Sequence, residues 1–468
     1  MRWPRFASNW DRLGLFVLSL GVRVAVCLWA AGRVPPSADG KYYDIIAKRI
    51  AAGEGYTWLW PDGTVTFAAH YPVGYPAMVG GLYALFGTYP VLAMLLGALL
   101  GAAAVVAVHS VLRGDTSRRR ALFGAGLLAI HPAVVPYTAA LMTEGVTLAL
   151  WSIALALFHK AHQRRARALA ITGALVLGVA TLVRPQTLLL APIFGFIFAP
   201  ASRGKTKGPT LGLRLGLAAM ALFITVAVCL PWTARNCSRM KSCALVSVNG
   251  GWNLLIGAQT NSGAWAPVEV PLPCRTVWDE AGKDACFGAV AQAEIRRSPM
   301  AFVQRMPAKL SATFDYFGAA PYYLHEANPA LVSAKAKVAL GTVETAFARL
   351  TLLLAVFGAA RGFASPRARC VVAGLAGLAL IFALSRHAWP AYLILALLLV
   401  ARGPSRRPSL VGAGIILLGT ALMHAVFFGA GRYGLMTVPV VCLAAAYCPL
   451  PCDLLSRVRM FFASTPAR

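Results

Sequence analysis

The chain has 468 residues, of which 58% are hydrophobic and only 13% are charged. A soluble domain is roughly half apolar and about a quarter charged, so this composition excludes an ordinary soluble protein. Apolar stretches long enough to cross a hydrocarbon core of about 30 Å recur along the sequence. The net charge of +28 comes from short basic clusters between these stretches, a pattern typical of cytoplasmic loops rather than of a nucleic-acid-binding surface. The sequence therefore predicts an all-α polytopic membrane protein that contacts membrane lipids and binds no nucleic acid.

The apolar stretches alternate regularly between basic and non-basic flanks. We predict about 12 spans, within a range of about 11 to 13 because three of the stretches are short. They cover residues 13–31, 91–112, 121–136, 146–158, 168–183, 188–198, 211–230, 338–360, 370–384, 389–400, 410–428 and 435–447. Lys and Arg gather in every second connection, so both termini are predicted to be cytoplasmic and the protein to lie in the inner (plasma) membrane.

Three regions follow from this topology. Residues 1–230 form an N-terminal transmembrane module, with residues 32–76 as its first outer loop. Residues 231–337 form a loop-rich extracytoplasmic region, and residues 338–468 form a C-terminal transmembrane module. Two further segments, 76–87 and 300–314, are too short or too amphipathic to cross, and they predict helices at the outer interface.

Polar residues from distant parts of the chain fall at the outer ends of the predicted spans. Ionisable groups at a membrane boundary are costly unless they are paired or line a polar cavity. Their convergence predicts a polar cavity that opens outward. The candidates are Asp39, Tyr43, His70, Tyr71, Tyr75, Glu144, Arg184, Arg235, Asn236, Asn249, Trp252, Arg432 and Tyr433.

These residue types suit one kind of chemistry. The carboxylates of Asp39 and Glu144 can take a proton from a hydroxyl or an amine. The guanidinium groups of Arg184, Arg235 and Arg432 match the oxygens of a phosphate and stay charged near lipid. Tyrosine and tryptophan offer flat faces for sugar rings. Together they predict transfer of a sugar from a lipid-linked phosphate.

Several motifs in fixed order carry a family resemblance. They are Asp39-Gly-Lys-Tyr-Tyr43, Tyr71-Pro-Val-Gly-Tyr75-Pro76, Met142-Thr-Glu144, Leu182-Val-Arg184-Pro185, Arg235-Asn236, Asn249-Gly-Gly-Trp252 and Gly431-Arg432-Tyr433. In this order the chain resembles GT-C glycosyltransferases, in particular the bacterial protein O-mannosyltransferase and aminoarabinose transferase relatives. The resemblance implies a GT-C bundle with outer interfacial helices, a polyprenyl-phosphate sugar donor and an acceptor bound on the extracytoplasmic side.

The resemblance also assigns roles. Asp39 matches the catalytic aspartate of the first outer loop, the candidate general base, and Glu144 matches an acidic position that orients the acceptor or a metal. The other candidates bind substrate, and the arginines grip the donor phosphate. Asp44, Glu54 and Asp62 are expected at surface or helix positions. The acidic pair usual in this family is Asp-Gly here, so the resemblance does not carry over the sugar, and the acceptor stays open among lipid, glycan and protein.

No cofactor is predicted from a defined motif. A divalent cation held by His70 and Glu144 stays open, although the sequence contains no spaced set of ligands and a hydrogen-bonded loop histidine is the simpler interpretation.

Four of the ten cysteines lie in the outer region, at Cys237, Cys243, Cys274 and Cys286. An even number in an oxidising compartment predicts disulfides. Among the three connectivities, nearness in sequence favours Cys237–Cys243 and Cys274–Cys286.

Two other functions need a polar cavity in a helix bundle. A transporter or lipid flippase typically has internal repeats and polar residues near the midplane, whereas here they gather at the outer ends and no repeat is visible. An O-antigen polymerase or ligase depends on a large late loop, whereas here the acidic centre follows the first span. Both comparisons favour the glycosyltransferase.

Overall fold

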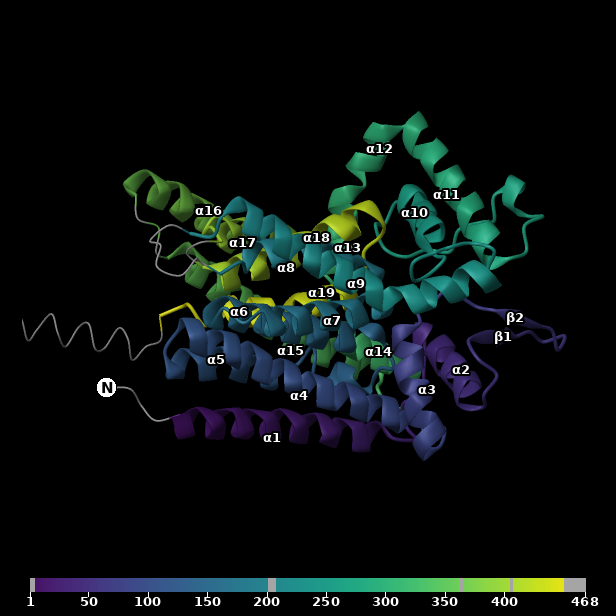
Figure 1. Ribbon diagram of the computed structural model, residues 1–468, viewed down its shortest axis with the longest axis horizontal. Coiled ribbons are helices and arrows are strands. Elements are labelled where there is room, and N and C mark those ends of the chain that lie inside the picture. Colours follow the sequence, from purple (N-terminus) through teal and green to yellow (C-terminus); the bar gives the residue numbers. More distant parts are fainter. Residues whose placement is uncertain (1–4, 201–207, 362, 364, 405–406, 450–468) are drawn as a thin grey trace, which may run out of the picture.

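The computed structural model describes residues 5–200, 208–361, 363, 365–404 and 407–449. The terminal residues 1–4 and 450–468, which were predicted to be cytoplasmic, lie outside the described residues. Within the described ranges a long bundle of helices is followed at one end by a smaller group of helices and a β-hairpin (Figure 1).

The predicted spans coincide with a helix or with a run of short helices, except that the span predicted at 121–136 is helical only to Ala129. The bundle consists of α1 (Arg5–Ala30), α4 (Pro90–Asp115), α5 (Arg118–Ala129), α6 (Thr143–Arg164), α7 (Arg167–Val183), η2 (Pro185–Leu189), α8 (Leu190–Ile197), α9 (Leu211–Arg239), α15 (Ala334–Ala360), α16 (Pro366–Leu384), α17 (Trp389–Val400), α18 (Pro408–Val426), α19 (Gly431–Gly434), η4 (Leu435–Thr437) and α20 (Val438–Ala445). Six of these helices are long and apolar enough to cross a membrane, namely α1, α4, α9, α15, α16 and α18. The predicted polytopic all-α membrane fold is confirmed, and the number of crossings stays a prediction.

The elements beyond the bundle come mainly from the two predicted outer regions. They are α2 (Asp39–Ala51), β1 (Thr57–Leu59), β2 (Val65–Phe67), α3 (Gly74–Phe86), η1 (Pro136–Ala139), α10 (Gly250–Gln259), η3 (Leu272–Cys274), α11 (Glu280–Arg297), α12 (Pro299–Gln304), α13 (Met306–Phe314) and α14 (Ala319–Ala327). Figure 1 shows α2, α3, the hairpin, α10 and α11 at the right-hand end of the bundle. The two interfacial segments are helical, as α3 and as the pair α12–α13.

Two details of the outer part differ from the sequence-based expectation. The antiparallel hairpin β1–β2, which pairs Thr57 with Phe67, was not predicted. Its turn is stabilised locally, because the Asp62 carboxylate accepts a hydrogen bond from the Thr64 N–H at 2.9 Å. Helix α9 does not end at residue 230 but continues through Pro231 to Arg239.

Ion pairs and hydrogen bonds show which ends of the helices lie together. At one end Asp11 of α1 pairs with Arg118 at the start of α5, at 2.6 Å, and Tyr447 donates to Asp115 at the end of α4. At the other end α1 leads into α2, whose first residue pairs with Arg432 of α19. The start of α1, the end of α4 and the start of α5 therefore lie together at one end, and the starts of α2 and α19 at the other.

Close approach between elements depends on glycine at two positions near the outer end. A Cβ at Gly74 of α3 would lie 2.7 Å from the backbone of Leu182, so only glycine lets α3 pack on the end of α7. A Cβ at Gly431 would lie 2.2 Å from the Tyr316 ring. The first contact joins α3 to α7, and the second sets α19 against Tyr316. Arg184 caps α7 and Arg432 lies on α19, so both contacts lie beside the arginines discussed next.

Candidate active site

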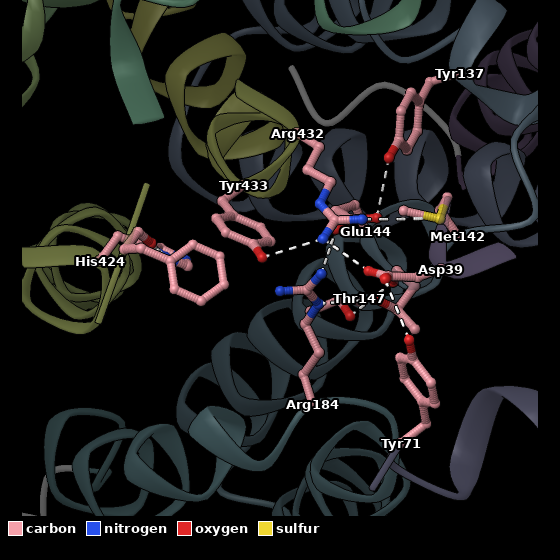
Figure 2. Close-up of polar contacts among 12 residues, drawn as sticks. Asp39, Tyr71, Tyr137, Met142, Glu144, Thr147, Arg184, His424, Arg432 and Tyr433 are labelled. Carbon is pink, nitrogen blue, oxygen red and sulfur yellow. Dashed lines mark hydrogen bonds and ion pairs between the residues drawn. The ribbon is translucent and has the colours of Figure 1, made fainter. Parts of the chain in front are cut away.

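Asp39 is the first residue of α2 and lies at the centre of the polar cluster in Figure 2. Its Oδ2 atom pairs with the Nη2 atom of Arg432 at 2.7 Å, and the Tyr71 hydroxyl donates to Oδ1 at 3.4 Å. A carboxylate in the first turn of a helix is favoured by the helix dipole. The Asp39 side chain keeps 31% of its surface exposed, so it is accessible to a substrate.

Glu144 lies in the first turn of α6 and has no exposed surface. Its Oε1 atom is ion-paired with Arg184, the residue that ends α7, and lies 3.6 Å from Nε of Arg432. The Tyr137 hydroxyl donates to Oε2 at 3.1 Å. A buried carboxylate needs such partners, so Glu144 anchors both guanidinium groups at the outer ends of their helices.

Arg432 connects the two carboxylates, and Tyr433 packs beside both arginines (Figure 2). The guanidinium carbon atoms of Arg184 and Arg432 lie 5.0 and 5.1 Å from the centre of the Tyr433 ring. The other face of that ring is supported by His424, stacked at 4.1 Å. Cation–π contacts of this kind help to hold two like charges close together.

Burial and nearby charges shift the pKa values of Asp39 and Tyr71. Burial by itself raises the pKa of the Asp39 carboxyl, but Arg432, Arg184 and His70 outweigh it and hold that pKa below its usual range. Burial, together with the nearby Asp39 charge, raises the pKa of the Tyr71 hydroxyl. At neutral pH Asp39 is therefore a carboxylate and Tyr71 a neutral hydroxyl.

The predicted tyrosines form an aromatic cluster next to Asp39, which Tyr71 contacts. Tyr43 contacts Tyr71 edge-to-face at 5.1 Å and Tyr75 at 5.4 Å. Tyr43 and Tyr75 are buried, so they support Tyr71 and do not line an open cavity. Tyr42, which is 44% exposed and stacked on Tyr71 at 5.6 Å, presents the accessible aromatic face.

A second group lies beside this aromatic cluster. The His70 ring is 5.7 Å from Trp252 of α10, and burial lowers the pKa of His70. Asn249 precedes α10 and accepts a hydrogen bond from Ser247 at 3.0 Å. The first outer loop is fastened to α11 here, because Glu280 accepts the backbone N–H groups of residues 69 and 70. These residues border the site without a direct bond to Asp39.

Arg235 and Asn236 do not join the other predicted residues. Both terminal nitrogens of Arg235 donate to backbone carbonyls, those of Ala68 and Tyr56, at 2.8 Å each. Asn236 is buried and donates to the carbonyl of Ala244 at 3.0 Å. The predicted phosphate contact of Arg235 is thus replaced by a structural one: α9 continues past residue 230 and turns this side chain toward the hairpin.

Asp44 also differs from expectation. Asp44 was expected at a surface or helix position. It does lie on helix α2, but its side chain is buried. It accepts a hydrogen bond from Tyr83 and pairs with Lys48, each at 2.7 Å. These contacts fasten α2 to α3.

The outer region contains two disulfides, Cys237–Cys243 and Cys274–Cys286. This is the connectivity that nearness in sequence favours. The first closes the loop after α9, and the second ties η3 to α11.

The donor set around Glu144 does not fit a divalent cation. Its carboxylate already accepts from Arg184 and Tyr137, and two guanidinium groups beside it would repel a metal ion. Among the described residues, no three His, Cys, Asp or Glu side chains cluster as a metal site would require. No chemical step is therefore assigned to a metal here.

Sequence reasoning missed three members of the cluster. Tyr137 and Thr143 position Glu144 and Arg184, the latter through a 3.0 Å hydrogen bond from Arg184 Nε to the threonine hydroxyl. Both flank Glu144 in the short outer connection, which was the available signal. His424 carries no such signal, since it lies in the last turn of the apolar helix α18 and reaches Tyr433 only through the fold.

The comparisons with known proteins bear on this geometry. Residues 70–229, about a third of the chain, match the family described as dolichyl-phosphate-mannose-protein mannosyltransferase. The resemblance to the protein mannosyltransferase relatives is therefore confirmed over this segment. The matched segment includes Tyr71, Glu144 and Arg184, whereas Asp39 and Arg432 lie on either side of it. No curated protein matches the chain over its sequence.

Two solved structures are similar to this chain. The oligosaccharyltransferase AglB from Archaeoglobus fulgidus, in complex with an inhibitory peptide and a dolichol-phosphate, is 15% identical with a TM-score of 0.47. The match covers 99% of this chain and 53% of AglB, so the chain spans about half the length of that protein. ArnT from Cupriavidus metallidurans, bound to undecaprenyl phosphate, is 17% identical with a TM-score of 0.44, over 92% of this chain and 77% of ArnT.

Proposed function

We propose that this protein transfers a sugar from a polyprenyl-phosphate donor to an acceptor on the extracytoplasmic side of the plasma membrane. The observation that carries the proposal is the meeting of Asp39 with Arg432 and of Glu144 with Arg184 within one cluster. This cluster lies at the end of the bundle that the Lys and Arg distribution assigns to the outside. The match of residues 70–229 to the mannosyltransferase family supports the same reaction class.

The two arginines are the proposed phosphate ligands. Arg184 binds Glu144 and Thr143 through Nη2 and Nε, and in the described part of the chain its Nη1 atom has no partner. Arg432 is 23% exposed and Arg184 14%, so both can be reached from outside. A guanidinium group offers five N–H donors, and those not used by protein partners can bind phosphate oxygens.

The proposed reaction is a single displacement at the anomeric carbon of the sugar. Asp39 accepts the proton of the acceptor hydroxyl or amine while the acceptor atom bonds to that carbon. The bond from the carbon to the phosphate oxygen breaks, and its electron pair stays on the departing polyprenyl phosphate. Arg184 and Arg432 stabilise the charge that develops there. Tyr42 and Trp252 are the aromatic faces proposed for the sugar.

The decisive test is Asp39→Asn in a transfer assay with purified, membrane-reconstituted protein and a polyprenyl-phosphate sugar. Loss of a general base lowers turnover by about 10² to 10⁴-fold, and we expect a loss in this range. Asp44→Asn is the matched control, since it changes a carboxylate five residues later on the same helix without touching the cluster. Near-normal turnover by folded Asp39→Asn protein would remove Asp39 from the role of base.

A further inference from the structure

Arg432 serves two carboxylates that differ in how firmly they are held. Its Nη2 atom lies 2.7 Å from Oδ2 of Asp39, whereas its Nε atom lies 3.6 Å from Oε1 of Glu144. Glu144 is closed off from solvent and has Arg184 and Tyr137 as further partners. Asp39 is exposed by 31%, and its only other polar contact among the described residues is the 3.4 Å bond from Tyr71. Asp39 is therefore the partner that Arg432 can lose more easily.

The pairing with Arg432 makes Asp39 a poor base as it stands. A carboxylate accepts a proton less readily when a guanidinium group stabilises its charge, and the lowered pKa of Asp39 reflects this. Efficient proton transfer requires a base whose pKa lies nearer the working pH. In the arrangement that Figure 2 shows, the proposed base is paired with Arg432.

A phosphate group competes for the same guanidinium donors. The phosphodiester of the donor carries one negative charge, as a carboxylate does, and its two unbridged oxygens can take two parallel N–H bonds from one arginine. Asp39 takes only one recorded contact from Arg432, at Nη2. The donors proposed for it are those of Arg432 and the Nη1 atom of Arg184, for which the described part of the chain offers no partner. A phosphate bound there would take the place that Asp39 holds on Arg432.

We propose that the donor phosphate displaces Asp39 from Arg432 and thereby releases the base, so that Asp39 becomes reactive only after the donor has bound. This inference rests on the function proposed above. Before the donor binds, Asp39 is neutralised by Arg432. Afterwards the phosphate neutralises Arg432, and Asp39 is held by the Tyr71 hydroxyl and faces the acceptor. Donor binding then precedes acceptor activation.

The test uses a ligand that cannot react, farnesyl phosphate, and the full-length protein in lipid nanodiscs. If Asp39 competes with the phosphate, Asp39→Asn binds farnesyl phosphate more tightly than wild type, by about tenfold, a usual size for coupling between two ligands of one site. In an Arg432→Gln background the same Asp39→Asn change has no such effect, because the contested group is absent. If the Gln variant does not fold, the Arg432→Lys background takes its place, because lysine keeps the positive charge but cannot make two parallel N–H bonds.

The outcomes separate this inference from the proposed function. Unchanged or weaker binding by Asp39→Asn overturns the inference, as does a gain that persists without Arg432, since that would be simple charge repulsion. A gain of the same size in Asp44→Asn also overturns it. Failure of wild-type protein to bind farnesyl phosphate contradicts the proposed donor. Near-normal turnover by folded Asp39→Asn protein contradicts the proposed base, and with it the release of a base, but not the competition for Arg432.

Discussion

The two ends of the helix bundle both carry charged clusters, and they are built differently. At the end away from Asp39, the Asp115 carboxylate accepts hydrogen bonds from Ser409 and Tyr447 and lies 3.4 Å from His159 Nε2. Neutral hydroxyls satisfy most of this charge, and the contacts tie α4 to α18 and to the segment after α20. Among the described residues no guanidinium group pairs with the Asp115 carboxylate, whose contacts come from two hydroxyls and a histidine.

The cluster around Asp39 instead contains as many guanidinium groups as carboxylates. Arg184 and Arg432 bring more N–H donors than Asp39 and Glu144 can use, and both side chains are partly exposed. An excess of directed donors next to an accessible carboxylate is costly to hold together and is of use only when a ligand arrives. The difference teaches that charge at a helix end does not by itself identify a site. The Asp39 cluster is distinguished by two partly exposed guanidinium groups beside an accessible carboxylate.

Among the variants that test this comparison, Glu144→Gln is expected to have the largest effect on stability and turnover. Gln cannot neutralise Arg184 and Arg432, so we expect the free energy of unfolding to fall by about 3 kcal/mol, as when one partner of a buried pair is removed. Turnover is expected to fall by about 10²-fold because the phosphate ligands lose their position. Denaturation and transfer assays measure the two effects.

Tyr137→Phe is the control for Glu144, since it removes one hydrogen bond and should cost about 1 kcal/mol. A Glu144→Gln protein with normal stability and turnover would contradict its role as the anchor.

An intermediate effect on stability is expected for Arg235→Gln. Comparing it with Arg184→Gln distinguishes a structural arginine from a substrate-binding one at the same end of the bundle. Arg235→Gln leaves the carbonyls of Ala68 and Tyr56 without donors, so stability should fall by about 2 kcal/mol. The KM for the donor should stay within about threefold of wild type, whereas Arg184→Gln should raise it by tenfold or more. If Arg235→Gln raised the donor KM as much as Arg184→Gln does, Arg235 would belong to the site after all.

The smallest effect is expected at the opposite end, from Asp115→Asn. Asn keeps one acceptor for Ser409 or Tyr447, so the loss is about 1 kcal/mol in unfolding free energy with no change in turnover. Ser409→Ala provides the matched control from the other side of the bond. A marked loss of turnover in folded Asp115→Asn protein would show that this end is not merely structural.

Much of the bundle could be predicted from the sequence because its signals are local. A run of apolar residues defines a span wherever it lies, and flanking Lys and Arg orient it. The predicted spans accordingly coincide with helix, apart from the second half of the span predicted at 121–136. The hairpin β1–β2 escaped prediction because its strands are only three residues long and give no periodic pattern.

Of the site, the sequence predicted Asp39, Glu144, Arg184, Arg432 and Tyr433, which the fold brings together. It could not separate them from Arg235, Asn236 or Asp44, since a pattern of residue types at outer ends does not say where a side chain points. The extra turns of α9 decide the direction of Arg235, and the packing of α2 on α3 buries Asp44.

By itself, the sequence determined that Asp39 lies at the outer end of a membrane bundle with arginines on the same side, because hydropathy and charge act residue by residue. Only the tertiary structure decided that Asp39 is paired with Arg432 while Glu144 takes Arg184. That choice depends on α3 packing on α7 through Gly74 and on α19 approaching Tyr316 through Gly431, contacts between segments far apart in the chain. The pairing of the proposed base with Arg432 therefore depends on the tertiary structure.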